Sequence, residues 1–159
     1  MNGLGGWLSV AKFQVGNGID KYIKQLTNLE FQSEDVVGHA IYQGAAVVAD
    51  AVKSSIRALP ASACNRLEKA ALIDGMGIAP MKNEDGYFNV KIGFDGYDSI
   101  KTTKFPRGRP ISMIARSIES GTSWRPKHPF VAPAVNKTKA LAEMAMAAEI
   151  DKRIRTIVS

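Results

Sequence analysis

Residues 33–60 read SEDVVGHAIYQGAAVVADAVKSSIRALP, and this stretch decides the fold. Apolar side chains recur in it at steps of three or four residues from Val37 to Leu59, which is the spacing of one helix face. Ser33 suits the N-cap position, and Pro60 disfavours helical geometry in the residue before it. We therefore predict a long helix from Ser33 to Leu59. Its many Gly and Ala residues predict that a second backbone packs closely against it.

The segments on either side of this helix predict a small sheet and further helices. Apolar and polar residues alternate from Phe88 to Phe94, which predicts a strand with one buried face. A turn cluster at residues 83–86 precedes it, so residues 76–82 can supply a partner strand in a hairpin. In chain order, the other predicted elements are a strand over 7–15, a turn at 16–18, and helices over 19–26, 61–73, 111–118 and 134–158.

Together these elements predict an α+β fold in one domain over residues 1–159. A small antiparallel sheet packs with one face against the two long helices, and short extra helices complete the domain. The last helix is expected to use a stripe made of Met144, Ala147, Ile150, Ile154 and Ile157. Residues 96–110 and 122–133 are predicted to be exposed basic loops, because both are rich in Pro and lack a sustained period.

Positive charge is concentrated in the last third of the chain. Residues 1–100 carry nine Lys/Arg and eleven Asp/Glu, whereas residues 101–159 carry twelve and four. Such a segment favours contact with nucleic-acid phosphate or with an acidic protein face, and a merely solvated surface is a third interpretation. The candidate interface residues are Lys101, Lys104, Arg107, Arg109, Arg116, Arg125 and Lys127.

The residues that catalysis or metal binding would need are sparse. His39 falls inside the first long helix and His128 inside a Pro-flanked loop, and neither belongs to a metal-binding spacing. The single Cys64 cannot form an intramolecular disulfide and is expected to be a small packed residue, as suits a reducing compartment such as the cytoplasm. We therefore expect no enzymatic activity, no metal site, no cofactor and no membrane span.

Residues 111–123 read ISMIARSIESGTS, and residues 129–134 read PFVAPA just before the last helix. This pattern resembles the tail-component family of tailed bacteriophages, the tail-completion or neck proteins that include lambda-type minor tail protein Z. In that family a helix ending in Glu-x-Gly-Thr is followed by a Pro-Phe-x-x-Pro-Ala segment. The matching positions here are Glu119, Gly121, Thr122, Pro129, Phe130, Pro133 and Ala134.

The resemblance extends over most of the chain, with two departures. Residues 44–53 look like the family's first long helix, and the predicted strand and short helix before it are similar to the family's amino end. The family's Pro-x-x-Thr-Gly-x-Leu segment keeps only its proline and leucine, as Pro60 and Leu67. Residues 96–110 look like an insertion.

The resemblance implies a structural virion protein of the phage neck that completes or attaches the tail. It implies a homo-oligomeric ring, a hexamer rather than a dodecamer, located in the virion after assembly in the host cytoplasm. Its partners would be the adjacent connector, tail-terminator or tail-tube proteins, with transient contact to DNA in the channel. Alternatives are a tail-terminator or head-closure ring protein and, outside the family, a small basic DNA-binding protein.

The family motif also has a reading in terms of chain geometry. Gly121 suits a left-handed C-cap after a short helix, and Thr122 or Ser123 can satisfy free backbone groups there. Phe130 lies between two prolines. It either packs on the sheet as part of a tight helix-loop-helix connection or contacts a neighbouring subunit.

Overall fold

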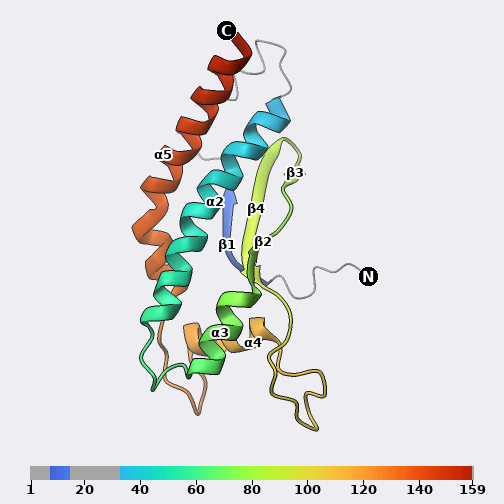
Figure 1. Cartoon of the computed structure of the whole chain (residues 1–159), viewed down its shortest axis with the longest axis vertical. Coiled ribbons are helices and arrows are strands. Elements are labelled where there is room, and N and C mark those ends of the chain that lie inside the picture. Colours follow the sequence, from blue (N-terminus) through green and yellow to red (C-terminus); the bar gives the residue numbers. More distant parts are fainter. Residues whose placement is uncertain (1–7, 15–32, 159) are drawn as a thin grey trace.

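The computed structural model describes residues 8–14 and 33–158, and the predicted turn at 16–18 and helix at 19–26 lie outside them. The fold is α+β, as predicted, with a small antiparallel sheet and two long helices (Figure 1). In chain order the described elements are β1 (Leu8–Gln14), α2 (Ser33–Ala58), α3 (Arg66–Gly75), β2 (Met76–Ile78), β3 (Lys82–Glu84), β4 (Tyr87–Phe94), α4 (Ile111–Ser120) and α5 (Val131–Val158).

Strand β4 is the centre of the sheet. It pairs antiparallel with β1 along one edge. Along the other edge it pairs antiparallel with two short strands, β2 at residues 92–94 and β3 at residues 87–89. The predicted hairpin partner of β4 is therefore present as two short strands. The expected alternation of burial along β4 is only partly correct, because Asn89 is 1% exposed although it lies on the face predicted to be polar.

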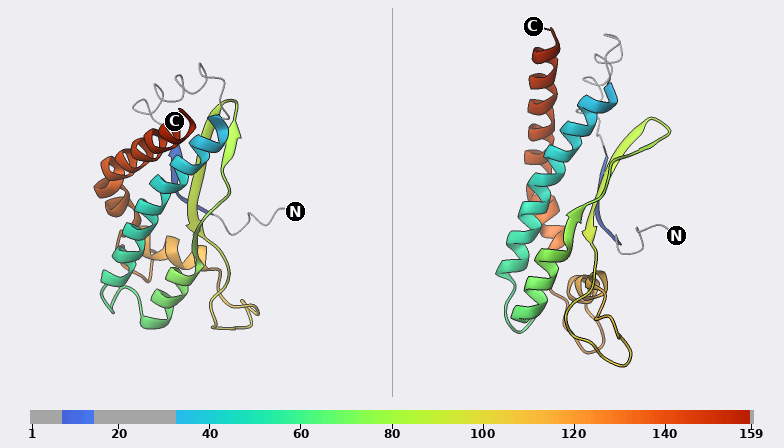
Figure 2. Two further views of the ribbon diagram at one scale, coloured as in Figure 1. Left: turned by 45° about the horizontal axis from the view of Figure 1, so that its top comes forward. Right: turned by 45° about the vertical axis from the view of Figure 1, so that its right-hand side comes forward.

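Helices α2 and α5 run antiparallel to each other and form a layer on one face of the sheet (Figures 1 and 2). The predicted face of α2, with Val37, Val48 and Ile56, is fully buried against α5 and the sheet. The predicted close approach is present: a Cβ on Gly44 would lie 2.6 Å from Cγ of Met146 on α5. The small residues of α2 therefore allow the two backbones to pack tightly.

The predicted stripe of α5 was wrong in its first half. Met144 is 67% exposed, whereas Ala142 and Met146 are buried against α2 together with Ile150. The helix also begins at Val131, three residues earlier than predicted. Apolar residues lie on several sides of α5. The three- and four-residue spacing alone therefore predicted the wrong buried face in the first half of the helix.

The two short helices and two loops form an end lobe, which we define as α3, α4 and residues 95–110 and 121–130 (Figure 1). Helix α3 begins at Arg66, later than the predicted 61, because Asn65 caps it and the preceding residues form a turn on the Pro60 carbonyl. The two loops are less exposed than predicted. Asp98 and Gly108 are buried, and residues 131–133 already belong to α5.

Candidate protein-docking surface

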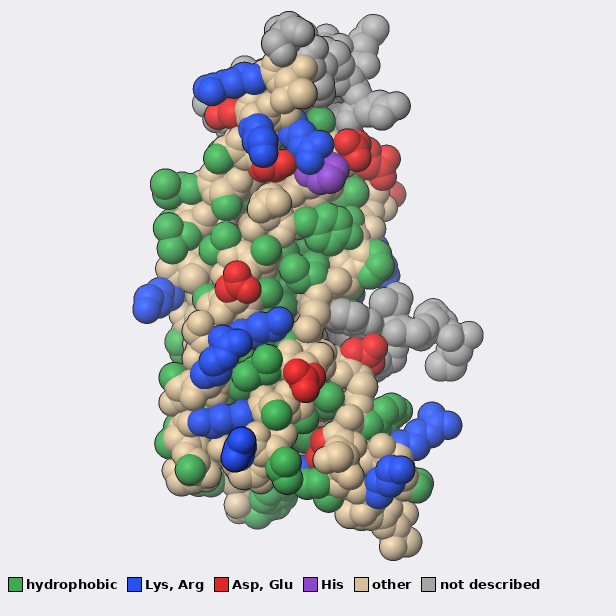
Figure 3. All heavy atoms as spheres, viewed as in Figure 1, with side chains coloured by type: hydrophobic (Ala, Val, Ile, Leu, Met, Phe, Trp, Pro, Cys, Tyr) green, Lys and Arg blue, Asp and Glu red, His purple; other side chains and the backbone are tan. Residues whose placement is uncertain are grey.

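Five of the seven predicted interface residues lie exposed on the end lobe, and we call them the basic rim. Three are in the loop between β4 and α4, one is on α4 and one is in the loop between α4 and α5. They are Lys101, Lys104, Arg107, Arg116 and Lys127. Figure 3 shows Lys and Arg side chains at the lower right, over the β4–α4 loop.

The other two predicted interface residues, Arg109 and Arg125, turn inward and belong to the interior of the end lobe. Both reach Glu68 on α3, whose side chain is only 3% exposed. Oε1 of Glu68 accepts from Nη2 of Arg125 at 2.7 Å and from Nη1 of Arg109 at 3.3 Å. Arg109 and Arg125 were predicted to face a partner. In the structure their charge is neutralised by Glu68 and Asp98 within the chain, so we assign them a structural role.

Asp98 completes this buried ion network. Nε and Nη2 of Arg109 each approach Oδ2 of Asp98 to 2.7 Å, and the backbone N–H groups of Arg109 and Ile100 donate to Oδ1. Two carboxylates therefore face two guanidinium groups, and the network joins α3 to both loops of the end lobe. A network that satisfies its charges internally fixes the loops in one arrangement.

The pKa of the Asp98 carboxyl reflects these contacts. Burial by itself raises the pKa, but hydrogen bonds from the backbone and side chain of Arg109 and from the Ile100 N–H, with the Arg109 charge, bring it below its ordinary value. Asp98 is consequently ionised at neutral pH and holds Arg109 in place.

Glu119, the first residue of the family motif, caps the amino end of α5. Its Oε2 accepts from the backbone N–H groups of Phe130 and Val131 at 2.7 and 2.9 Å, and its Oε1 accepts from that of Ala132 at 3.1 Å. A carboxylate at this position satisfies the unpaired N–H groups of the first turn and interacts favourably with the helix dipole. The spacing between Glu119 and the PFVAPA segment therefore has a physical reason.

The remaining motif residues shape the same connection. Phe130 is buried and its ring meets that of Phe94 edge-on, with centroids 6.3 Å apart, which agrees with the interpretation that it packs on the sheet. Ala134 is buried one turn further along α5, while Pro129 and Pro133 are exposed at the start of that helix.

The predicted left-handed C-cap of α4 was wrong. Gly121 does have a positive φ of 75°, but its ψ of 169° lies far from the left-handed helical region. A Cβ there would lie 3.0 Å from the Lys127 backbone nitrogen, because the loop folds back on the end of α4. Thr122 acts within this loop, where its Oγ1 accepts from the Arg125 N–H at 3.0 Å.

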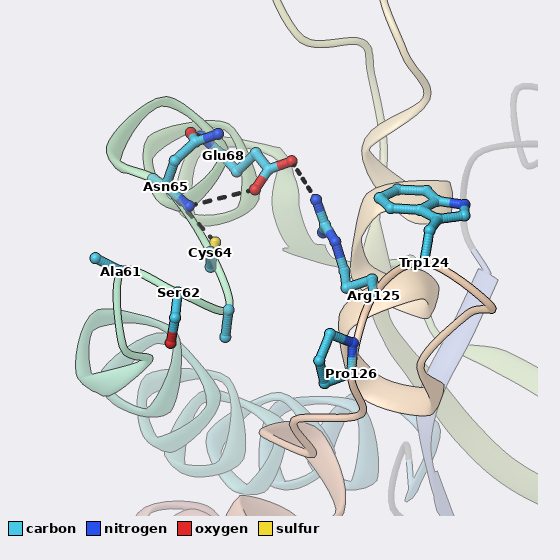
Figure 4. A pocket seen from close by; sticks show the side chains of 9 residues that line it. Ala61, Ser62, Cys64, Asn65, Glu68, Trp124, Arg125 and Pro126 are labelled. Atoms are coloured by element: carbon cyan, nitrogen blue, oxygen red, sulfur yellow. Dashed lines mark hydrogen bonds and ion pairs between the residues drawn. The ribbon is translucent and has the colours of Figure 1, made fainter.

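A hollow of about 190 Å³ lies between the loop of Trp124 and the turn that precedes α3 (Figure 4). Its lining residues are Ala61, Ser62, Ala63, Cys64, Asn65, Glu68, Trp124, Arg125 and Pro126. Burial and, next, the charge of Glu68 raise the pKa of the Cys64 thiol to about 11. The thiol is therefore protonated at neutral pH and points to the Asn65 carbonyl oxygen at 3.7 Å.

Sequence reasoning missed the centre of the network, Glu68 and Asp98. One local signal was available for Glu68, since Asn65 and Glu68 form a capping box in which each side chain accepts from the other's backbone N–H. No comparable local signal marks Asp98, which meets Arg109 eleven residues away.

Residues 8–14 and 33–158 contain neither an evident metal site nor a helix suited to span a membrane. Within this part of the chain, no group of three or more His, Cys, Asp or Glu side chains is placed to hold a metal ion. None of the described helices combines the length and apolar character that crossing a membrane requires. In comparison with known proteins, the chain matches no family model, no curated protein and no solved structure.

Proposed function

We propose that the chain is a structural subunit of the neck of a tailed bacteriophage, where it forms a ring and completes or attaches the tail. The observation that carries this proposal is the presence of two exposed surfaces of different chemistry on the same fold. One is the basic rim of the end lobe. The other is an apolar stripe on the outer side of α5.

The α5 apolar stripe consists of Ala140, Leu141, Met144 and Ala148, which share one helix face and are all exposed. Leu141 is 55% exposed, although the opposite side of α5 is already buried against α2. A helix that is apolar on both sides has more apolar surface than its own chain covers. This stripe is suited to contact with a neighbouring subunit.

A closed ring needs a heterologous interface, in which a patch on one subunit meets a different patch on the next. The α5 apolar stripe supplies one such patch. The basic rim lies on a separate lobe, so it remains available for an adjoining protein of the neck. The PFVAPA motif, which carries the resemblance to the tail-component family, supports the proposal by fixing how α5 leaves the end lobe.

The small DNA-binding protein is the weaker candidate. The basic rim is spread over two loops and α4, rather than along one helix that could enter a groove. The rim's loops carry two largely exposed aromatic rings, Tyr97 and Trp124, and these lie on different loops. Two separate rings do not form a row of stacking platforms along the charge.

Complementation of tail attachment tests the proposal. Without this chain, heads and tails are expected to accumulate separately, and adding the purified chain should join them. Leu141→Glu combined with Met144→Glu should fail to join them, because charges would replace the apolar stripe. Tyr87→Glu, which changes an exposed aromatic ring at the start of β4, is the matched control and should join them normally.

Joined particles that form without the chain would contradict the proposal. So would a duplex-DNA affinity that falls steeply with salt in a chain that plays no part in joining, because that result favours the DNA-binding alternative.

A further inference from the structure

The side chain of Trp124 is the most exposed of the large apolar side chains in the end lobe. It is 72% exposed, yet it sits on a loop whose backbone is fixed at several points. The Thr122 N–H donates to the Arg125 carbonyl at 2.8 Å, and the His128 N–H donates to the Ile118 carbonyl at 2.8 Å. The loop is thus ordered by the chain itself.

The guanidinium group of Arg125 packs against one face of the Trp124 indole. Its guanidinium carbon lies 5.2 Å from the centroid of the Trp124 ring, while its Nη2 is bound to the buried Glu68. Nη1 of Arg125 also donates to Oγ of Ser117 on α4 at 3.2 Å. The exposed ring therefore rests on a side chain that is anchored at two places.

An exposed tryptophan on an ordered loop has the properties of a binding hot spot. Because the loop is already ordered, little conformational entropy is lost when a partner binds the tryptophan, and the large ring can fill a pocket on that partner. The hollow between Trp124 and the turn at residues 61–65 offers a recess beside the ring for a projecting part of the partner (Figure 4).

The charge around Trp124 specifies the partner. Residues 99–139 contain nine Lys/Arg, of which Arg109 and Arg125 are neutralised in the buried network and seven are not. The same residues contain one acid, Glu119, whose carboxylate is occupied by three backbone N–H groups at the start of α5. The end lobe that carries the indole therefore has an excess of exposed positive charge. A partner that accepts it would carry acidic side chains around an apolar pocket.

A second copy of the chain fits this requirement poorly. Residues 34–98 carry nine Asp/Glu and six Lys/Arg, and two of those acids, Glu68 and Asp98, are buried. The remaining charges on that part of the surface are almost balanced, so they offer no strong acidic counterpart to the rim. A different protein is favoured.

We propose that Trp124 is a preordered anchor that inserts into an apolar pocket, rimmed by acidic residues, on a different protein of the phage neck, and that the basic rim of the same end lobe attracts those acidic residues. This inference rests on the proposed function, because it names the partner surface of the same end lobe.

The test uses heads and tails made without this chain, each mixed with the purified chain and sedimented. Wild-type chain should bind one of the two particles, and Trp124→Ala should bind it about 30-fold more weakly or worse, as for a hot-spot residue. Trp124→Phe should bind with an intermediate affinity because it keeps an aromatic ring. Tyr87→Ala removes an equally exposed ring, 69% accessible, outside the end lobe and should bind like wild type.

The outcomes separate the two proposals. If wild-type chain binds neither particle, the proposed function fails. If wild type binds and Trp124→Ala binds within about twofold of it, or if Tyr87→Ala is equally impaired, the anchor is overturned while the proposed function stands. Loss of self-association, or of duplex-DNA binding, as the main effect of Trp124→Ala would also overturn it, because the partner would then be a second copy or a nucleic acid.

Discussion

Both buried carboxylates of the described chain, Glu68 and Asp98, lie in the end lobe, whereas the layer of α2, α5 and the sheet buries apolar side chains with the uncharged Asn89 and Thr138. The helix-sheet layer is held by non-directional apolar contact, which depends little on pH. In the end lobe, α3 and α4 also bury apolar side chains such as Leu72 and Ile118, but the loops are held by ion pairs and hydrogen bonds. Such polar contacts specify orientation more than they add stability. The two proposed surfaces are divided in the same way, with the α5 apolar stripe on the helix-sheet layer and the basic rim on the end lobe. The basic rim and Trp124 lie where loops must be held in one arrangement.

The largest effect is expected in the helix-sheet layer, at Phe94. Phe94→Ala should lower the free energy of unfolding by about 4 kcal/mol, because it empties a fully buried ring site and removes the contact with Phe130. Urea unfolding followed by circular dichroism measures this change. Tyr87→Ala at the exposed end of the same strand is the control, with a change of about 0.5 kcal/mol or less. A loss below about 1 kcal/mol for Phe94→Ala would contradict the assignment of this region as the core.

A smaller but more local effect is expected at Glu68. Glu68→Gln should cost about 2–3 kcal/mol, because it leaves the charges of Arg109 and Arg125 without their shared partner, and both arginines keep some access to water. Since Cys64 is the only cysteine and is buried beside the network, its rate of reaction with a thiol reagent reports opening of the end lobe.

The two regions should then respond differently to Glu68→Gln. Under native conditions Cys64 should react faster, while circular dichroism shows the helices unchanged. Glu143→Gln, an exposed change on α5, is the matched control and should alter neither signal. Equal protection of Cys64 in wild type and Glu68→Gln would show that the network does not hold the lobe.

A still smaller effect is expected from acid. Because the folded-state pKa of Asp98 lies below its ordinary value of 3.8, its contribution is present at neutral pH and is lost as pH falls through and below 3.8. Asp98→Asn should therefore show a smaller loss of stability between neutral pH and about pH 3 than wild type. Urea unfolding at both pH values measures the difference. An equal or larger loss in Asp98→Asn would contradict the account.

The smallest effect on stability is expected at the basic rim. Replacing Lys101, Lys104 and Arg107 together by Ala should change the free energy of unfolding by about 0.5 kcal/mol or less per residue, because all three side chains are exposed. The same variant should lose affinity for its particle and show a weaker dependence of binding on salt. Thermal unfolding and sedimentation measure the two properties, and a large fall in stability would place these residues in the fold instead.

The sequence predicted the helix-sheet layer well because its signals are local. The three- and four-residue steps of α2 and the alternation along β4 each arise from one element that buries one face. Helix α5 was harder, since Met144 and Met146 are chemically alike and only the position of α2 decides which of them is buried.

The interior of the end lobe could not be predicted in the same way. Glu68 meets Arg109 and Arg125 across 41 and 57 residues of sequence, and nothing in a local window distinguishes an inward arginine from an exposed one. Two of the seven candidate interface residues therefore proved to be structural. The Glu119 motif was visible in the sequence, but its reason, the capping of α5, needed the geometry of the loop.

Electron cryomicroscopy of the assembled particle tests the central claim most directly. It is expected to show this chain as a ring in the neck, with α5 between neighbouring subunits and with Trp124 and the basic rim seated on an acidic surface of an adjoining protein. A particle whose neck contains no density for the chain, or a ring in which the end lobe faces only solvent, would contradict it.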